Sequence, residues 1–330
     1  MNRKPTRRAA LGTIGGFALG SLAALPAGAQ PAYPSRPVRI VVPFPPGGTS
    51  DILARLAAEQ LAAEMGQPFI VDNRAGGAAN IGADMVAKAA PDGYTLLLIS
   101  TIHFINAGLF EGRLSYDVLR DFAPIGLIAG VSQVVLVNPA LPVSTLGELI
   151  AYARARPGAL NYSSPGNGSQ PHLTAELFAT ATGARMVHVP YRGAPQALTD
   201  VVNGQVQLTF ATSPSAVPLV RSGQVRALAV TSAQRIAALP EVPTTAEAGM
   251  PGFESVGGNG LAAPAGTPPA LVERLSAGVA RMLGRPELQR ALAEQGADAR
   301  PMTPPEFTAY IAGEVARWRE AVRLSGAKPE

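Results

Sequence analysis

The stretch "PFPPGGTSD", residues 43–51, separates two regular segments of the chain. Before it, Val38–Val42 has the apolar composition of a buried strand, and after it apolar residues recur at helical spacing. A loop that only reverses the chain needs neither the prolines nor the two adjacent glycines. Bare backbone N–H groups at the start of a helix bind anions. The stretch therefore predicts that a negatively charged group contacts this loop.

Strand patterns and helical patterns alternate through the rest of the chain, which predicts an α/β protein with mostly parallel sheets. Two extended apolar segments, 122–130 and 253–264, are expected to be the two crossings of a hinge. The predicted domains are a signal peptide at 1–29, a first lobe at 30–128 plus 256–330, and a second lobe at 129–255. Helices are expected near 50–65, 81–89, 145–155, 171–182, 194–203, 269–283, 286–296 and 304–323. Strands are expected at 38–42, 69–72, 95–100, 133–137, 160–163, 186–189, 206–210 and 225–231.

The first 29 residues have the features of a signal peptide. A basic start without acids is followed by a glycine-diluted apolar stretch and then by Ala27-Gly28-Ala29, a cleavage motif. Arg7 and Arg8 favour a twin-arginine signal, and the alternative is an ordinary Sec signal that contains two arginines. The chain has no cysteine to carry a lipid. We expect a soluble, unlipidated protein that is exported to the periplasm and begins at Gln30.

Charge and composition limit the class of partner. The chain has 330 residues, 47% of them hydrophobic, and a formal net charge of +4. The signal peptide holds four of the 27 Lys and Arg residues and none of the 23 Asp and Glu residues, so the mature chain is neutral. No basic field remains that would attract nucleic acid. We expect a monomer that binds a small molecule.

A second strand-to-helix loop repeats the opening arrangement, in "NYSSPGNGSQPHLTAELF" at 161–178. Glycines in both loops lack Cβ, so a ligand can approach the backbone closely, and nearby hydroxyls can donate hydrogen bonds. The four glycines are Gly47, Gly48, Gly166 and Gly168, and the hydroxyls belong to Thr49, Ser164 and Ser169. Each loop taken alone is a weak signal and is better explained as a plain turn that caps a helix. Two such loops facing each other across a cleft would hold an anion from both sides.

The residues that could support catalysis are scattered. His103, His172 and His188 lie in different segments, and no zinc-binding, nucleophile-elbow or nucleotide-phosphate motif occurs. Asp51 is a possible general base, but an acid in a first helical turn commonly stabilises the helix dipole. Arg192 either faces the cleft as a carboxylate partner or lies on the surface. We predict no catalytic residue, metal or cofactor, and the alternative function is a secreted hydrolase or isomerase that uses Asp51 or His172.

Four segments resemble the Bug (TctC-like) family of periplasmic substrate-binding proteins of tripartite tricarboxylate transporters. They are "YPSRPVRIVVPFPPGGTSDILAR", "VDNRAGGAANIGADMVAKAAPDGYTLL", "HVPYRGAPQALTDVVNGQVQLTF" and "LPEVPTTAEAGMPGFE". The resemblance extends from Tyr33 to Met302. It implies a two-lobed periplasmic-binding-protein-like fold of type II that closes on a small carboxylate. It also implies that the two loops, "PFPPGGTSD" and "SPGNGS", hold the carboxylate oxygens through backbone groups and ordered waters.

The expected partners are a small carboxylate and either inner-membrane transporter subunits or the ectodomain of a sensor. The expected ligand-binding residues are Phe44, Gly47, Gly48, Thr49, Asp51, Asn80, Ser100, Thr101, Ser164, Gly166, Gly168, Ser169, His172, Tyr191 and Thr212. The chain departs from the family pattern at Ala211, where an acid is common, and at Gly258, where Trp is common. The first change disfavours an amino-acid ligand, and the second is expected to widen the cleft or loosen the hinge. Ile102 and His103 also differ from the family pattern and are placed near a strand end.

Overall fold

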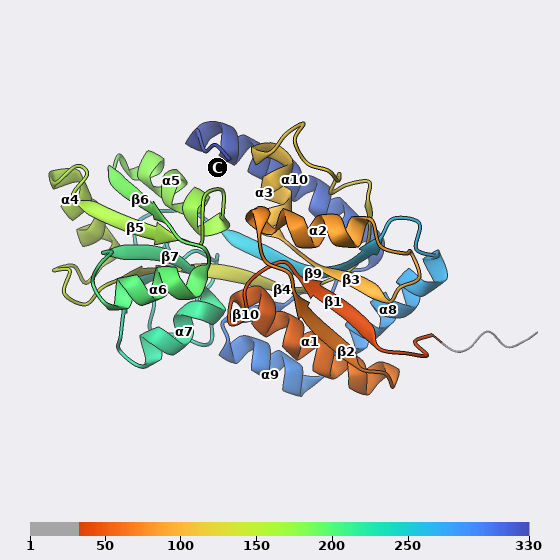
Figure 1. The fold of residues 1–330 in the computed structure, drawn as a ribbon. Helices are drawn as coiled ribbons and strands as arrows, with labels where there is room; N and C mark the ends of the chain where they lie inside the picture. Colours follow the sequence, from red (N-terminus) through yellow and green to blue (C-terminus); the bar gives the residue numbers. More distant parts are fainter. Residues whose placement is uncertain (1–32, 330) are drawn as a thin grey trace, which may run out of the picture. The chain divides into compact units, whose positions relative to one another are not determined.

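The computed structural model describes residues 33–329, so the predicted signal peptide lies outside the described part of the chain. The strands form two half-sheets that share one long strand, β4 (Phe122–Val137) (Figure 1). The first part of β4 pairs with β9 (Val256–Pro264), and residues from Gln133 onward pair with strands of the second half-sheet. The chain therefore passes from one half-sheet to the other within a single strand.

The first half-sheet has three parallel strands at one edge and antiparallel pairs at the centre. It contains β1 (Val38–Val42), β2 (Phe69–Asn73), β3 (Thr95–Ser100), β9, the first part of β4, and β10 (Ala297–Ala299). One face packs against α1 (Thr49–Met65), α8 (Pro269–Leu283) and α9 (Pro286–Glu294). The other face packs against α2 (Asn80–Ala87), α3 (Thr101–Leu109) and α10 (Pro304–Ser325). Successive strand residues alternate between these two apolar clusters, as the period of a strand requires.

The second half-sheet is built in the same way. It contains β5 (Leu160–Ser164), β6 (Met186–Pro190), β7 (Leu208–Thr212), β8 (Arg226–Val230) and the end of β4. One face packs against α4 (Leu146–Ala155) and α5 (Gln170–Thr182), and the other against α6 (Ala194–Val202) and α7 (Ser213–Arg221). Each half-sheet with its helices makes up one half of the molecule, the first half and the second half.

Most expected elements occur within a few residues of their predicted limits, but two expected segments are joined in one strand, and α3, α7 and the short strand β10 were not predicted. The segments 122–130 and 133–137 form one continuous strand, because β4 pairs with β9 up to Ser132 and with strands of the second half-sheet from Gln133 onward. Helix α3 was missed because it follows β3 directly, without turn residues between them. Helix α7 was missed because Pro218 inside it removes a helical hydrogen bond.

The predicted lobe limits stay a prediction, because residues from Tyr33 onward form one compact unit by their contacts. Within the described residues, no helix combines the length and the hydrophobicity that crossing a bilayer requires.

Candidate functional site: a cavity lined by helix N-termini

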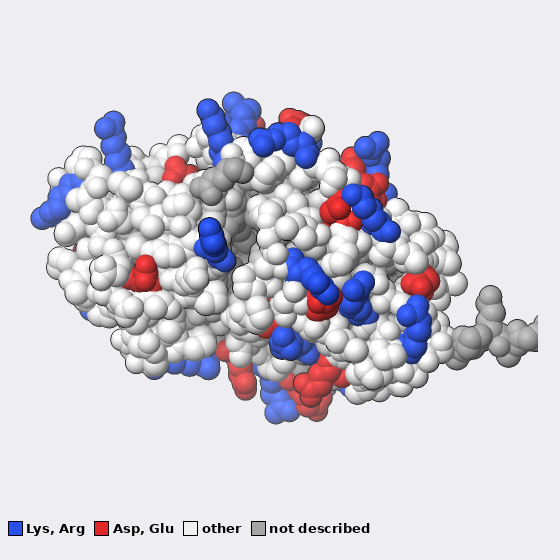
Figure 2. Space-filling view, viewed as in Figure 1, with Lys and Arg blue, Asp and Glu red and all other residues white. Residues whose placement is uncertain are grey.

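A cavity of about 690 Å³ lies between the two halves, at the carboxyl ends of the parallel strands. Figure 2 shows this hollow from outside, with few charged side chains on its walls. The lining comes from the segments that follow β1, β2 and β3 in the first half and β5, β6 and β7 in the second half. Gly258 and Asn259 of β9 complete it, together with Pro329 near the C-terminus. This edge of an α/β sheet is where ligands commonly bind.

The starts of several helices meet at this cavity. Residues at or next to the N-termini of α1, α3, α5, α6 and α7 belong to the lining, as does the short turn Gly77–Ala79 ahead of α2. Each helix N-terminus carries about half a positive charge together with unpaired backbone N–H groups. Arg192 is the one charged side chain among the described lining residues, which include no Asp or Glu. The cavity therefore favours an anion over a cation.

In the first half, Asp51 braces the loop 43–50 from outside the cavity. Its carboxylate accepts hydrogen bonds from the Gly47 N–H at 3.0 Å, from Arg55 at 3.0 Å and from Asn73 at 3.0 Å. Burial raises the pKa of Asp51, but the hydrogen bonds from Arg55, Gly47 and Asn73 outweigh it and hold the pKa below its usual value. Asp51 is therefore a charged structural residue with its oxygens already bonded.

The helix start that this brace supports has open donors. Among the described residues, the backbone N–H groups of Gly48, Thr49 and Ser50 make no hydrogen bond. All three residues line the cavity. Gly48 has an ordinary φ of −84°, and a Cβ there would have its nearest neighbour, the Pro45 carbonyl oxygen, at 3.8 Å.

In the second half, three backbone donors of the loop 164–169 are hydrogen-bonded within the loop or to the first turn of α5. The Gly166 N–H donates to Ser164 Oγ at 3.2 Å, and the Ser169 N–H donates to the Gly166 carbonyl at 3.2 Å. The Gly168 N–H donates to His172 Nδ1 at 3.1 Å. Gly168 has φ +70°, and a Cβ there would lie 2.1 Å from Leu109 Cδ2 on α3. Only glycine fits this position, because the loop presses directly on the first half.

An aromatic stack lies beneath this loop. The His172 and His188 rings stack with their centroids 4.0 Å apart, and Tyr162 stacks on His188 at 4.9 Å. Burial, with a smaller contribution from His172, lowers the pKa of His188 to about 3. His188 Nε2 lies 2.6 Å from Ser164 Oγ, and Tyr162 donates to Glu176. Because His172 Nδ1 accepts from Gly168, the neutral ring carries its proton on Nε2. The stack supports the loop.

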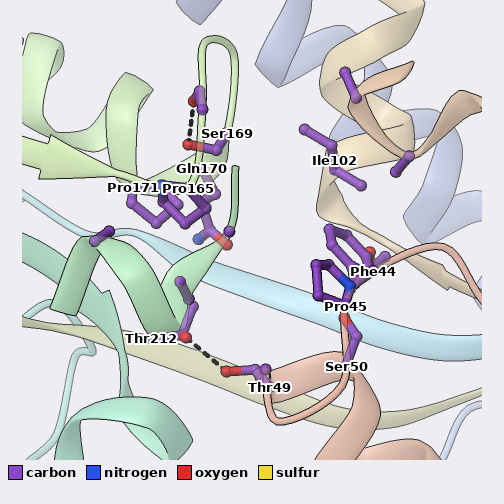
Figure 3. A pocket seen from close by; sticks show the side chains of 18 of the residues that line it. Phe44, Pro45, Thr49, Ser50, Ile102, Pro165, Ser169, Gln170, Pro171 and Thr212 are labelled. Atoms are coloured by element: carbon purple, nitrogen blue, oxygen red, sulfur yellow. Dashed lines mark hydrogen bonds between the residues drawn. The ribbon is translucent and has the colours of Figure 1, made fainter. Parts of the chain in front are cut away.

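The halves also touch across the floor of the cavity. Thr49 Oγ1 lies 2.6 Å from Thr212 Oγ1 (Figure 3). It also lies 3.1 Å from Ser215 Oγ. Thr49 begins α1, whereas Thr212 ends β7 as the N-cap of α7 and Ser215 lies in the first turn of α7. These hydroxyl contacts bridge the cavity.

The structure brings most of the predicted ligand-binding residues together. Nine of them line the cavity: Phe44, Gly48, Thr49, Ser100, Thr101, Gly166, Ser169, Tyr191 and Thr212. Six lie outside the lining: Gly47, Asp51, Asn80, Ser164, Gly168 and His172. Five of these six have the bracing roles described above. Asn80 Oδ1 accepts from Asn106 at 2.9 Å and from the Tyr116 hydroxyl at 2.7 Å, which ties α2 to α3.

Sequence reasoning missed several lining residues, among them Ser50, Gln170, Ser215 and Asn259. Three of these lie in the first turn of a helix, so a search at helix starts rather than at glycines would have found them. Arg192 lines the cavity and is exposed.

One expectation about the departures from the family pattern needs correction, whereas Ile102 and His103 lie just after the end of β3, as expected. A Cβ at Gly258 would lie 2.7 Å from the Tyr310 hydroxyl and 3.0 Å from Leu127, so the missing side chain makes room for α10 and does not widen the cavity. Ile102 lines the cavity, whereas His103 is fully buried outside it, and burial lowers its pKa to about 4. Ala211 does line the cavity. No group of three or more His, Asp or Glu side chains within residues 33–329 could hold a metal ion.

Comparisons with known proteins identify the family. The sequence profile of the TctC family, described as tripartite tricarboxylate transporter family receptor, matches residues 53–326. The chain belongs to this family. It is 40% identical to BugT of Bordetella pertussis over 319 residues, which are 96% of this chain and 98% of BugT. The predicted family resemblance is therefore confirmed.

Solved relatives share the fold. Rpa4515 of R. palustris, solved with adipate, is 40% identical with a TM-score of 0.87, over 90% of this chain and 100% of that one. MatC of Rhodopseudomonas palustris, with bound malate, is 34% identical with a TM-score of 0.81, over 88% of this chain and 100% of that one. The periplasmic binding protein BugD is 31% identical with a TM-score of 0.84, over 90% of this chain and 100% of that one. The predicted two-lobed, periplasmic-binding-protein-like fold is confirmed, and this TctC-family member belongs among solute-binding proteins.

Proposed function

We propose that this TctC-family protein captures a small carboxylate in the cavity between its halves and passes it to a transporter of the tripartite tricarboxylate type. One observation carries the proposal: helix N-termini from both halves meet at a cavity whose described lining has one Arg and no acid. Related proteins solved with adipate and malate agree with this choice of ligand.

The start of α1 is the proposed carboxylate site. Three neighbouring backbone N–H groups, at Gly48, Thr49 and Ser50, have no hydrogen-bond partner among the described residues. A carboxylate that accepts from them would satisfy donors that are otherwise unpaired and would gain from the helix dipole. Hydrogen bonds to a charged group contribute about 1.5–3 kcal/mol each. Three backbone donors can therefore bind a carboxylate without a charged side chain.

We infer that the halves act as lobes that open and close around the crossings near Ser132–Gln133 and near Val256. The contact between Thr49 and Thr212 bridges the cavity, so the halves must part for a ligand to enter from that side. In this proposal, residues 1–29 direct export, the mature protein works in the periplasm as a monomer, and its partner is the membrane part of the transporter.

The placement of Asp51 and His172 argues against the alternative of a hydrolase or isomerase. Both residues lie outside the cavity lining. The Asp51 carboxylate is occupied by three donors, and His172 Nδ1 accepts from the Gly168 N–H. A general base must reach the proton that it removes. Neither side chain is placed to do so.

Calorimetry with a panel of carboxylates, sugars and polyamines tests the proposal, with mass spectrometry of the recovered ligand. We expect saturable binding of a carboxylate that is recovered unchanged. Gly48→Val should weaken this binding at least tenfold, because its side chain would enter the space in front of the α1 donors. Gly147→Val is the matched control, since Gly147 is an exposed glycine of α4 with no atom near its Cβ position. Chemical conversion of the ligand, or equal loss of binding in both variants, would overturn the proposal.

A further inference from the structure

Apolar side chains face one another across the cavity. Phe44, Pro45 and Ile102 lie on the wall of the first half, and Pro165 and Pro171 lie on the opposite wall (Figure 3). Phe110 of the first half and Leu198 of the second half also line the cavity. These walls stand on either side of the space that a ligand held at the α1 donors would occupy.

Most polar side chains of the lining are already hydrogen-bonded within the protein. The Tyr191 hydroxyl donates to Asp200 at 2.6 Å, Thr209 donates to the Ser163 carbonyl at 2.8 Å, and Ser169 donates to the Gly166 carbonyl at 2.7 Å. The remaining contacts join Thr49 to Thr212, Ser50 to Asn259, Gln170 to Ser255, and the Gly258 N–H to Thr101. The hydroxyl protons of Tyr191, Thr209 and Ser169 are therefore engaged within the protein and cannot be donated to a ligand.

A polar substituent on the ligand is therefore costly here. A hydroxyl or an ammonium group placed between Phe44 or Ile102 and the prolines of the opposite wall would lose its water and lie against carbon atoms on both sides. A buried polar group without a hydrogen bond weakens binding, because the hydrogen bonds to water that it gives up are not replaced. Because the described lining has no carboxylate, an ammonium group would also lack a counter-charge. A hydrocarbon body would instead gain from contact with both walls.

We infer that this protein selects carboxylates with an apolar body, namely an unsubstituted alkyl chain or an aromatic ring, over hydroxy acids and amino acids. The inference rests on the proposed function, because it assumes that a carboxylate occupies this cavity. Family membership leaves the question open, since the relatives Rpa4515 and MatC hold adipate, which has no hydroxyl, and malate, which has one. The cavity volume of 690 Å³ lies within the range of about 300–1,000 Å³ that is typical of pockets for drug-sized organic molecules. An alkyl chain or an aromatic ring therefore fits this cavity.

Matched ligand sets test the preference by calorimetry on the mature protein. Succinate, malate and aspartate share one dicarboxylate skeleton and carry hydrogen, hydroxyl or ammonium at the same carbon. Benzoate with 4-hydroxybenzoate, and phenylpropionate with phenylalanine, extend the comparison to rings. We expect each polar substituent to weaken binding by about tenfold or more, the factor that corresponds to 1.4 kcal/mol.

The two possible failures are distinguishable. If carboxylates bind but the hydroxylated or aminated member of each set binds as tightly as the plain one, the inference is overturned and the proposed function stands. If no carboxylate binds while another ligand class does, the proposed function itself fails and the inference fails with it.

Ile102→Thr tests whether the wall determines the selection. This substitution keeps a branched side chain but places a hydroxyl on the wall of the first half. We expect the preference for the plain over the hydroxylated ligand to fall several-fold, while the melting temperature without ligand stays close to that of the wild type. Leu119→Thr is the control, because Leu119 is exposed and lies outside the lining. An unchanged preference in Ile102→Thr would overturn the assignment of Ile102 as a specificity-determining residue.

Discussion

The loops 43–50 and 164–169 look alike in sequence but present different surfaces to the cavity. In the first loop, the brace from Asp51 lies outside the lining and the donors of Gly48, Thr49 and Ser50 remain open. In the second loop, the donors of Gly166, Gly168 and Ser169 are bonded to atoms of the same segment. The comparison shows that two helix starts with similar glycine-rich sequences can differ in whether their backbone N–H groups are left free for an anion.

The glycines of the two loops also differ in why a side chain is absent there. Gly48 has an ordinary φ of −84° and open space around its Cβ position. Gly168 has φ +70° and lies against Leu109 of the other half. One glycine leaves room for a ligand, whereas the other lets the two halves pack.

The largest expected effect is the difference in stability between alanine variants of these two glycines. Gly168→Ala should lower the free energy of unfolding by about 3 kcal/mol, because alanine at positive φ costs about 1–2 kcal/mol and overpacking against Leu109 costs a further 1–3 kcal/mol. Gly48→Ala should change it by less than about 0.5 kcal/mol, as substitutions away from tight contacts do. Denaturant unfolding of both variants measures the difference. Equal stability of the two variants would remove the distinction between the loops.

A second prediction concerns the acceptor that holds the Gly168 N–H. His172→Leu leaves this buried donor without a partner and should lower the free energy of unfolding by about 1–3 kcal/mol. His172→Asn places an oxygen near the position of Nδ1 and should recover part of the loss. Hydrogen exchange at the Gly168 amide gives the specific readout, because it should speed up in the leucine variant and less in the asparagine variant. If both variants exchange at the same rate, stacking alone explains the role of His172.

The contribution of Asp51 to the stability of the first loop should depend on pH. Because the folded pKa of Asp51 lies below its usual value of 3.8, its charge stabilises the fold above that pH, and this stabilisation is lost as the pH falls through the folded pKa. Asp51→Asn should therefore be less stable than the wild type by about 1 kcal/mol at neutral pH, on the scale of one hydrogen bond. Unfolding curves from pH 7 to pH 3 should show the two proteins converging only below about pH 4. A constant difference over the whole range would assign the effect to packing.

The smallest expected effect concerns the bridge between the two halves. Thr212→Val removes the hydroxyl that contacts Thr49 and should weaken carboxylate binding by about two- to fivefold, the range that corresponds to about 0.5–1 kcal/mol for one hydrogen bond. We expect the change mainly in the dissociation rate, measured by stopped-flow fluorescence, because the bridge holds the halves together. Thr308→Val on the exposed side of α10 is the control. A slower dissociation in Thr212→Val would mean that the bridge competes with the ligand.

Patterns between neighbouring residues in the sequence were enough to predict the order of elements and the two loops. The alternation of strand and helix, the two loops at strand ends and the positions of Gly48 and Gly166 followed from composition and periodicity, because these features depend on neighbours along the chain. Tertiary structure decided which donors stay open, that Leu109 meets Gly168, and that Gly258 faces Tyr310. It also joined 122–130 to 133–137 in one strand and placed Ile102 on the cavity wall. These outcomes depend on contacts between residues far apart in the sequence, such as Thr49 with Thr212, whose distances only the packing of the whole fold determines.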